Sequence, residues 1–366
     1  MDVRKTKRNG MIELLRFLFC ITIIFFHINM LILGLPVCGK GINFAIFPYG
    51  FLGVEFFFII SGLFMVQSID KSREKNKDED VVKKDLDFIK HKLDKIFPQH
   101  VISFIIIFIV TIITNKFGLV KSIKLLIESL PNFFLVDFTG ISLKLINSFE
   151  WYISAMLLIF IIIYPIIYKK YDYVVKIYAP IICLFLYGFL IQNYESITRV
   201  RTWNGYIYLG LIRALADILV GVSIYEITKK LKILNLTKIK KILITLIELF
   251  CYIITFLLML LTVHSSYTII MLFFLTIGIV ITYSGISYTS KIHGSFIEFL
   301  GELSFTMYLT QLVGLRIVAT YFNNNSKLEI IILVFSIIYI VSIITMFIEK
   351  LFKKIRSGNR YEKVKL

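Results

Sequence analysis

The feature of this sequence that most constrains its fold is a series of apolar blocks, each about 20 residues long, with short charged segments between them. About 20 apolar residues are enough for an α-helix to cross a bilayer, at about 1.5 Å per residue. The composition agrees, because 58% of the residues are hydrophobic and only 18% are charged. A soluble protein of this length would carry its apolar residues in short periodic stripes. The blocks therefore indicate a helical membrane protein.

Ten blocks are candidate spans, so the sequence predicts an all-α polytopic membrane protein, a helical bundle of about ten transmembrane helices. The blocks cover approximately residues 11–34, 46–69, 96–114, 149–168, 177–193, 207–227, 242–262, 268–286, 297–320 and 329–349. With the N-terminus inside, 30 of the 41 Lys and Arg residues fall in inner segments and 8 in outer ones. This bias predicts that both termini are cytoplasmic. Because the charge lies at span ends, the net charge of +17 does not indicate a nucleic-acid partner.

We expect residues 1–350 to form a single transmembrane domain, followed by a basic cytoplasmic tail, 351–366, that binds anionic lipid headgroups. The longest cytoplasmic loop is 70–95 and the longest outer loop is 115–148. Within the outer loop, residues 120–130 are predicted to form a helix that lies along the membrane surface. The first span lacks a small-residue cleavage pattern, which predicts a retained helix and not a signal peptide.

The four cysteines are Cys20, Cys38, Cys183 and Cys251. They show no metal-ligand spacing, and only Cys38 is expected outside a span. We therefore expect neither a disulfide framework nor a metal site.

The first span contains a cationic residue, Arg16, and a titratable ring, His27. At about 100° per residue, their separation is three turns plus about 20°, so they lie on one helix face, about 16 Å apart along the axis. An Arg in lipid costs at least about 2.5 kcal/mol, so this face is expected to look into a protein interior or a wet cavity. We interpret the pair as a functional site. The alternative is a snorkelling Arg and a satisfied core His.

Other polar residues are predicted at the depth of His27. Counting from the outer ends of the spans places Glu55 within about one turn of His27, and consecutive helices normally pack side by side. We therefore expect the Glu55 carboxylate to contact and orient the imidazole. Arg213 and Asp217, four positions apart in one span, are predicted to form a structural ion pair. Further residues are expected in the outer half of the bundle: Asn29, Gln311, Arg316 and Trp151.

Two of these residues have a plainer alternative, Trp151 as an interfacial anchor and Gln311 as a bridge between helices. On the inner side, Lys92 and Lys95 flank the apolar line of an amphipathic helix predicted at 85–95. They are interpreted either as positive-inside anchors or as a cationic site for a phosphate-bearing ligand that approaches from the cytoplasm.

Several segments resemble membrane acyltransferase family 3, the multi-pass bacterial O-acyltransferases that act on cell-surface glycans. Arg16 and His27, with ten residues between them, are similar to the motif of the family's first helix. Segment 53–62, GVEFFFIISG, resembles the family's second-helix segment, with Glu55 in place of the usual Asp. Segment 88–100 resembles a cytoplasmic motif that contains two Arg, a Pro and a Tyr. Two later segments are similar as well: 151–156 and 301–311.

The chain departs from this pattern at several positions. Lys92 and Lys95 replace the two Arg, which keeps the charge and loses bidentate phosphate geometry. His100 stands in place of Tyr, and Met156 stands where one branch of the family has Glu. Gln311 occupies a place that is often His. Because Gln is neither acid nor base at neutral pH, a mechanism with two histidines does not carry over.

The resemblance implies an O-acetyltransferase-like enzyme of the bacterial plasma membrane, with no bound cofactor. Its donor would be cytoplasmic acyl-CoA, and its acceptor a hydroxyl of an extracytoplasmic, cell-surface or lipid-linked glycan. His27 would be the general base or a transient acyl carrier, Arg16 would guide or polarise the donor, and Glu55 would orient His27. The residues expected to bind donor or acceptor are Lys92, Lys95, Asn29, Trp151, Gln311 and Arg316.

A different class of function uses the same polar face. In a transporter or flippase for a polysaccharide precursor or small metabolite, Arg16 and His27 would line a substrate path. The sequence shows no inverted repeats and no Gly/Pro-broken helices in matching halves, which favours the enzyme.

Overall fold

The computed structural model describes residues 8–35, 45–75, 80–141, 145–194, 197, 199–261 and 267–363. Within these residues the regular structure is helical, apart from one isolated β-bridge between Trp203 and Tyr208. Eight helices of this described part are long and apolar enough to cross a membrane. The predicted all-α polytopic class is therefore confirmed, whereas the number of crossings and the side of the termini remain predictions.

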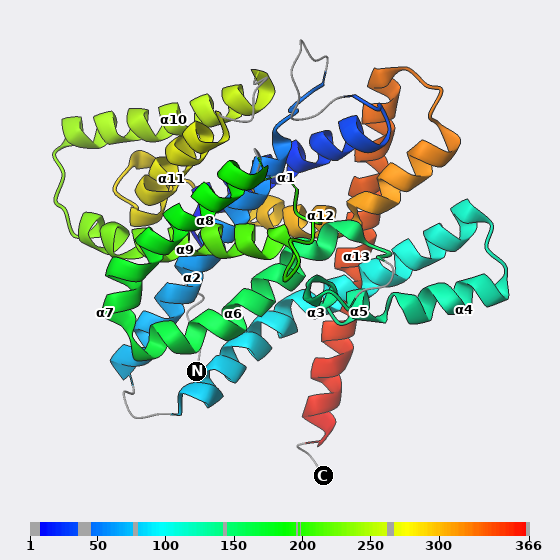
Figure 1. Ribbon diagram of the computed structural model, residues 1–366, viewed down its shortest axis with the longest axis horizontal. Helices are drawn as coiled ribbons and strands as arrows, with labels where there is room; N and C mark the ends of the chain where they lie inside the picture. Colours follow the sequence, from blue (N-terminus) through cyan, green and yellow to red (C-terminus); the bar gives the residue numbers. More distant parts are fainter. Residues whose placement is uncertain are drawn as a thin grey trace.

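In the described residues, each of the ten apolar blocks falls on a helix (Figure 1). These helices are α1 (Gly10–Leu31), α2 (Gly53–Lys75), α3 (Val81–Asn115), α6 (Trp151–Lys169), α8 (Ala179–Tyr194), α9 (Leu209–Lys232), α10 (Lys238–Leu261), α11 (Thr268–Ser284), α12 (Ser295–Tyr321) and α13 (Lys327–Lys363). Two of them are not among the eight membrane candidates. α11 has only 17 residues, and α9 carries Arg213, Asp217 and Glu226 within its apolar part.

Shorter elements connect the long helices. They are η1 (Gly50–Leu52), α4 (Leu119–Glu128), α5 (Leu130–Phe133), η2 (Asp137–Thr139), η3 (Ser148–Glu150), α7 (Tyr171–Tyr173), η4 (Val174–Tyr178) and η6 (Tyr288–Lys291). Most of them lie between spans, and η3 leads directly into α6.

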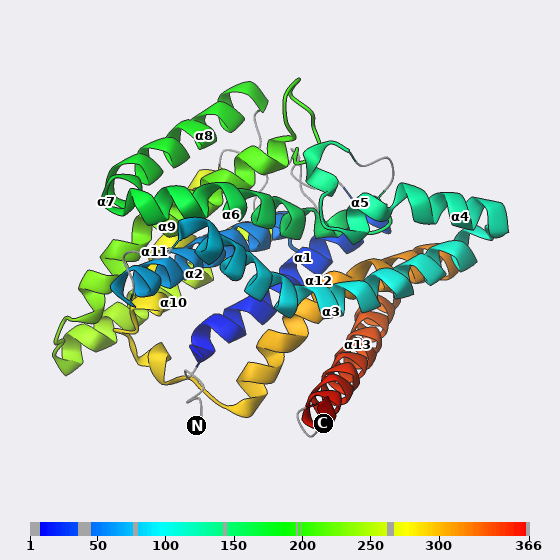
Figure 2. The ribbon, with the colours of Figure 1, turned by 90° about the horizontal axis from the view of Figure 1, so that it is seen from below.

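Two helix pairs form the centre of the bundle, α1 with α12 and α2 with α9. Figure 1 shows α10 and α11 at one edge, and α4 with the end of α3 projecting at the opposite edge. Figure 2 shows the starts of α1 and α12 and the end of α13 on one side, and α5 on the other. This separation agrees with the alternation of inner and outer segments that the charge pattern predicts.

The α2–α9 contact depends on two glycines. A Cβ added to Gly62 would overlap the backbone carbonyl of Ile218, and one added to Gly221 would overlap that of Ile59. Small residues at such positions let two membrane helices approach closely. Because α9 is packed in this way, Arg213 and Asp217 in its apolar part are enclosed by protein.

Three helix boundaries differ from the predictions. The predicted amphipathic helix 85–95 and the span 96–114 are one helix, α3, which continues through Pro98. Pro98 removes a single backbone donor, and α3 is supported on both sides by α6 and α12. α2 starts at Gly53, which places Glu55 in its first turn. α13 extends to Lys363, so most of the predicted tail is helical.

The predicted surface helix at 120–130 is present as α4, and its apolar residues Leu119 and Val120 are 77% and 81% exposed. Cys20, Cys183 and Cys251 are free thiols, and Cys38 lies outside the described residues.

Candidate active site

Arg16 and His27 lie on the side of α1 that packs against α12. Between them, the Cys20 thiol donates to the carbonyl of Ser304 at 3.2 Å, and His27 Nδ1 is 2.8 Å from Gln311 Oε1. Arg16 and His27 are half-buried, whereas Cys20 is fully buried. The α1–α12 interface thus has a partly accessible ionisable group near each end and a closed segment between them.

Gln311 determines which nitrogen of His27 carries the proton. The side-chain nitrogen of Gln311 donates to the carbonyl of Tyr308 at 2.9 Å, so its oxygen is the atom that faces the imidazole. An amide oxygen only accepts hydrogen bonds, and therefore Nδ1 of His27 donates. In the neutral ring this leaves a free lone pair on Nε2, the state that a general base requires.

Phe149 of η3 constrains the same imidazole from its face. The two rings are stacked, with centroids 3.8 Å apart and planes 24° apart. The turn that carries Phe149 is held by three polar contacts. Asn147 accepts from the Phe149 N–H at 3.2 Å, the Tyr308 hydroxyl donates to the Phe149 carbonyl, and Arg201 donates to the preceding carbonyl at 2.5 Å. Sequence analysis missed Phe149, because an apolar residue in a loop carries no chemical signature.

Glu55 does not contact His27, and the prediction that it orients the imidazole is wrong. Its carboxylate forms an ion pair with Arg213 of α9, and Arg213 also donates to the carbonyl of Phe51 at 3.3 Å. The reason is the order of the helices in space. α2 packs mainly on α9, while the polar face of α1 turns to α12.

The predicted ion pair between Arg213 and Asp217 is also replaced by another arrangement. Asp217 accepts a hydrogen bond from the Tyr187 hydroxyl of α8, and Arg213 pairs with Glu55 instead. Glu55 and Asp217 are 0% exposed and Arg213 is 2% exposed. These residues therefore form a buried polar core that links α2, α8 and α9.

The other outer residues occupy separate places. Trp151 is 7% exposed, and the Arg213 guanidinium lies over its ring at 5.5 Å, which rules out an interfacial anchor. The Asn29 side chain donates to the carbonyl of Ile46 at 2.7 Å and so fixes the segment before α2. Arg316 is half-buried on α12, beyond Gln311. In the described chain, Trp151, Asn29 and Arg316 make no contact with His27.

At the N-terminal end of α1, which the charge pattern predicts to be cytoplasmic (hereafter the inner end), the structure brings the predicted cations together. The Lys92 ammonium is half-buried over the rings of Phe88 and Phe160, at 5.5 and 5.7 Å from their centroids. It lies close enough to Arg16 and Lys95 for the three positive charges to interact. Lys95 is exposed. This cluster can attract a polyanionic ligand from the inner side.

A polar strip, formed by Arg16, Ser61 and Tyr152, lies next to the Arg16 end of the α1 face. The Tyr152 hydroxyl is 3.2 Å from Ser61 Oγ, and it is within electrostatic range of Arg16. Arg16 itself pairs with Glu13 at 3.0 Å. α1, α2 and α6 therefore each contribute one hydrogen-bond donor to this strip: Arg16, Ser61 and Tyr152.

A second group that sequence analysis did not assemble lies under the outer loop. His100 Nε2 donates to the Phe133 carbonyl at 2.9 Å, and its Nδ1 is 3.0 Å from Glu150. Asp137 is 2% exposed, and burial, with the nearby Glu150 charge, raises the pKa of its carboxyl to about 6. Because Glu150 directly follows Phe149, this buried group also helps to hold the turn against His27.

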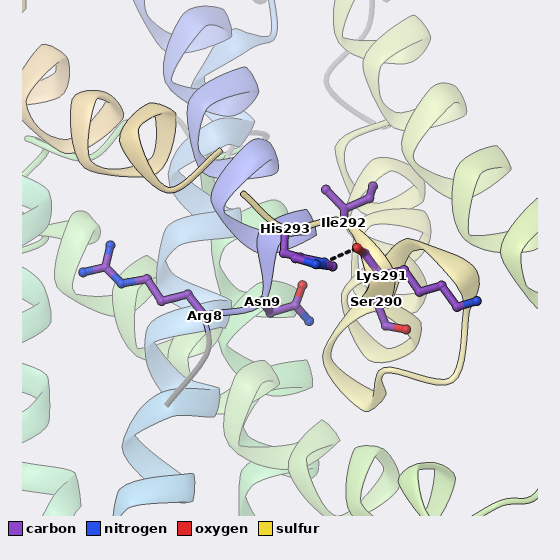
Figure 3. A pocket seen from close by; sticks show the side chains of 6 residues that line it. All are labelled: Arg8, Asn9, Ser290, Lys291, Ile292 and His293. Carbon is purple, nitrogen blue, oxygen red and sulfur yellow. Dashed lines mark hydrogen bonds between the residues drawn. The ribbon is translucent and has the colours of Figure 1, made fainter. Parts of the chain in front are cut away.

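A pocket of about 420 Å³ lies at the inner end of α1. It is lined by Arg8, Asn9, Ser290, Lys291, Ile292 and His293. Figure 3 shows that the Arg8 and Lys291 side chains extend to opposite sides, away from the other lining residues. Asn9 is already engaged, since it caps α1 and donates to the Thr282 carbonyl at 3.0 Å. None of the predicted site residues lines this pocket.

Comparison with known proteins identifies the family. A family model described as an acyltransferase domain, that of acyltransferase family 3, matches residues 9–348. No curated protein and no solved structure matches the chain. Since the family match covers most of the 366 residues, this chain belongs to acyltransferase family 3 and is a membrane acyltransferase.

Proposed function

We propose that the chain is an O-acyltransferase of the bacterial plasma membrane that moves an acyl group, most simply acetyl, from cytoplasmic acyl-CoA to a hydroxyl of an extracytoplasmic glycan. The observation that carries this proposal is the state of His27. Gln311 accepts from Nδ1 at 2.8 Å, which leaves Nε2 free to take a proton from an acceptor hydroxyl.

The donor would bind at the inner end. Lys92, Lys95 and Arg16 supply positive charge for the phosphates of acyl-CoA, with the two lysines acting as point charges and not as bidentate clamps. In this scheme Arg16 guides the pantetheine arm of the donor at the inner end, near the Tyr152 hydroxyl, and the thioester carbonyl reaches farther along the α1 face toward His27. Acyl-CoA is a substrate in this scheme, and no resident cofactor takes part.

The transfer then needs one base. The acceptor hydroxyl gives its proton to Nε2 of His27 while its oxygen attacks the thioester carbonyl carbon. A C–O bond forms, the C–S bond breaks, and the proton passes from His27 to the sulfur, so that CoA leaves as the thiol. The same lone pair on Nε2 would serve if His27 carried the acyl group transiently.

The remaining predicted residues have supporting roles in this proposal. Gln311 fixes the tautomer of His27, and Arg316 lies on the acceptor side. Glu55, Asn29 and Trp151 act through the packing of α2, which positions Ser61 beside Tyr152.

The proposal is tested by following CoA release and acylation in lipid nanodiscs, with labelled acetyl-CoA and the surface polysaccharide of the producing cells. We expect His27→Ala to lower the transfer rate at least about 100-fold, because it removes the base. Gln311→Leu should lower it about 10-fold or more, since Nδ1 loses its acceptor and the ring its fixed tautomer. Gln192→Leu, at an exposed position of α8, is the matched control and should be unchanged.

Transfer at the normal rate by a correctly folded His27→Ala protein would contradict the assignment. Uptake or export of polysaccharide without any release of CoA would identify a transporter instead.

A further inference from the structure

The loop between α8 and α9 forms a small rigid hairpin, residues 199–208 (hereafter the outer hairpin). Trp203 and Tyr208 form a β-bridge, and Asn204 N donates to the Ile207 carbonyl at 3.2 Å. The Asn204 side chain accepts from the N–H groups of Tyr206 and Ile207 at 3.0 and 2.9 Å. Gly205 has a φ of +98°, which suits glycine at the tip of a turn. The hairpin is therefore preformed.

The outer hairpin exposes two large aromatic rings. Trp203 is 47% exposed and Tyr206 is 85% exposed. Trp203 meets the Tyr208 ring edge-on at 5.1 Å, and a Cβ at Gly140 would lie 3.1 Å from the indole. Contact on these sides fixes the indole while leaving part of its surface free. A fixed, partly exposed aromatic ring binds a flat apolar surface at little cost in conformational entropy.

The same hairpin is joined to the turn that orients His27. Arg201 donates to the carbonyl of Ser148 at 2.5 Å, and the next residue, Phe149, stacks on His27 at 3.8 Å. The Tyr208 ring also packs on Phe138, 5.2 Å between centroids. A ligand on the exposed rings would thus be connected to His27 through Arg201 and the turn of Ser148 and Phe149.

We propose that the outer hairpin is the acceptor-binding platform, on which a sugar ring of the glycan stacks against Trp203 and Tyr206. A pyranose has an apolar C–H face that matches an aromatic ring, and hydroxyl edges that need hydrogen-bond partners. Arg199 and Arg201, both exposed on the same hairpin, supply donors for those hydroxyls or for acidic groups on the glycan. This inference rests on the proposed function, because it names the binding site of the proposed acceptor.

Binding can be measured directly, because the chain has two tryptophans and only Trp203 is exposed, Trp151 being buried. The probe is the mixture of oligosaccharides released from the surface polysaccharide of the producing cells, added to the protein in nanodiscs. We expect a saturable change in fluorescence and protection from acrylamide quenching, both missing in Trp203→Phe. If the oligosaccharides have no effect and lipids with brominated acyl chains quench the Trp203 fluorescence, Trp203 is an interfacial anchor and the proposal is overturned.

Kinetics give the second readout. The double variant Trp203→Ala and Tyr206→Ala should raise the KM for the polysaccharide at least 10-fold, with a much smaller change in kcat. Tyr267→Ala, 47% exposed at the start of α11, is the matched control and should keep both parameters. An unchanged KM in the double variant, together with loss of transfer in His27→Ala, would overturn only this inference. Acyl transfer at the normal rate by the His27→Ala variant would instead contradict the proposed function itself.

Discussion

At His27, the residue that fixes the proton comes from a helix that is remote in sequence. Gln311 is 284 positions away, so periodicity within α1 cannot identify it. The spacing of Arg16 and His27 predicted their common face, because helix geometry alone determines that relation. Glu55 failed as a partner for the opposite reason. Its depth was estimated from one span, whereas its contact with Arg213 depends on which helices are neighbours.

Asp137 provides a test of electrostatics at a single residue. Burial raises the pKa of its carboxyl from 3.8 to about 6, so the folded protein binds this proton more tightly than the unfolded chain does. The free energy of unfolding should therefore fall as the pH rises from about 4 to 6, and stay lower above that range. A shift of about two units corresponds to about 3 kcal/mol.

The Asp137→Asn variant removes this ionisation. We expect its thermal unfolding midpoint to exceed that of the wild type at pH 7.5 and to match it near pH 4. The exposed position Asp87 offers a control, since Asp87→Asn should leave the midpoint unchanged at both values. A pH-independent difference between Asp137→Asn and the wild type would show that packing, and not charge, is responsible.

At the scale of elements, the long helices were predictable and the short turns were not. Apolar blocks of about 20 residues locate α1, α6 and α12 within a few positions. η3 has three residues and no periodicity, yet it carries Phe149 against His27. Its position is set by bonds from α12 and from the outer hairpin, which are tertiary contacts.

The α2–α9 contact makes a prediction with an internal control. A Cβ at Gly221 would overlap the Ile59 carbonyl, so Gly221→Ala should force α2 and α9 apart and destabilise the protein by about 1–3 kcal/mol. Gly188, within α8, has no atom within 4 Å of its added Cβ. Gly188→Ala should therefore stabilise by about 0.5–1 kcal/mol, through lower backbone entropy in the unfolded chain. Thermal unfolding in nanodiscs measures both, and a loss of stability in both variants would contradict the assigned contact.

For the whole molecule, the distribution of positive charge predicts sidedness that helix packing alone does not determine. Figure 2 shows the start of α1 and the end of α13 on the same side. Together with the Lys and Arg bias, this predicts a cytoplasmic C-terminus. Green fluorescent protein fused after Leu366 should fluoresce, and alkaline phosphatase fused after Asn324 should be active. A dark C-terminal fusion would reverse the assigned orientation, and with it the sides of the donor and the acceptor.

The buried side of α1 between Arg16 and His27 has a consequence for the passage of ions. Phe19, Cys20 and Ile24 are 0% exposed and Ile23 is 1% exposed, so this buried side of α1 offers water no path along it from Arg16 to His27. Ions do not cross such a dry apolar barrier at a useful rate, because shedding their hydration is too costly. Each resting copy should therefore insulate the membrane as well as the lipid that it displaces. Many copies can then be present in a membrane without adding an ion leak.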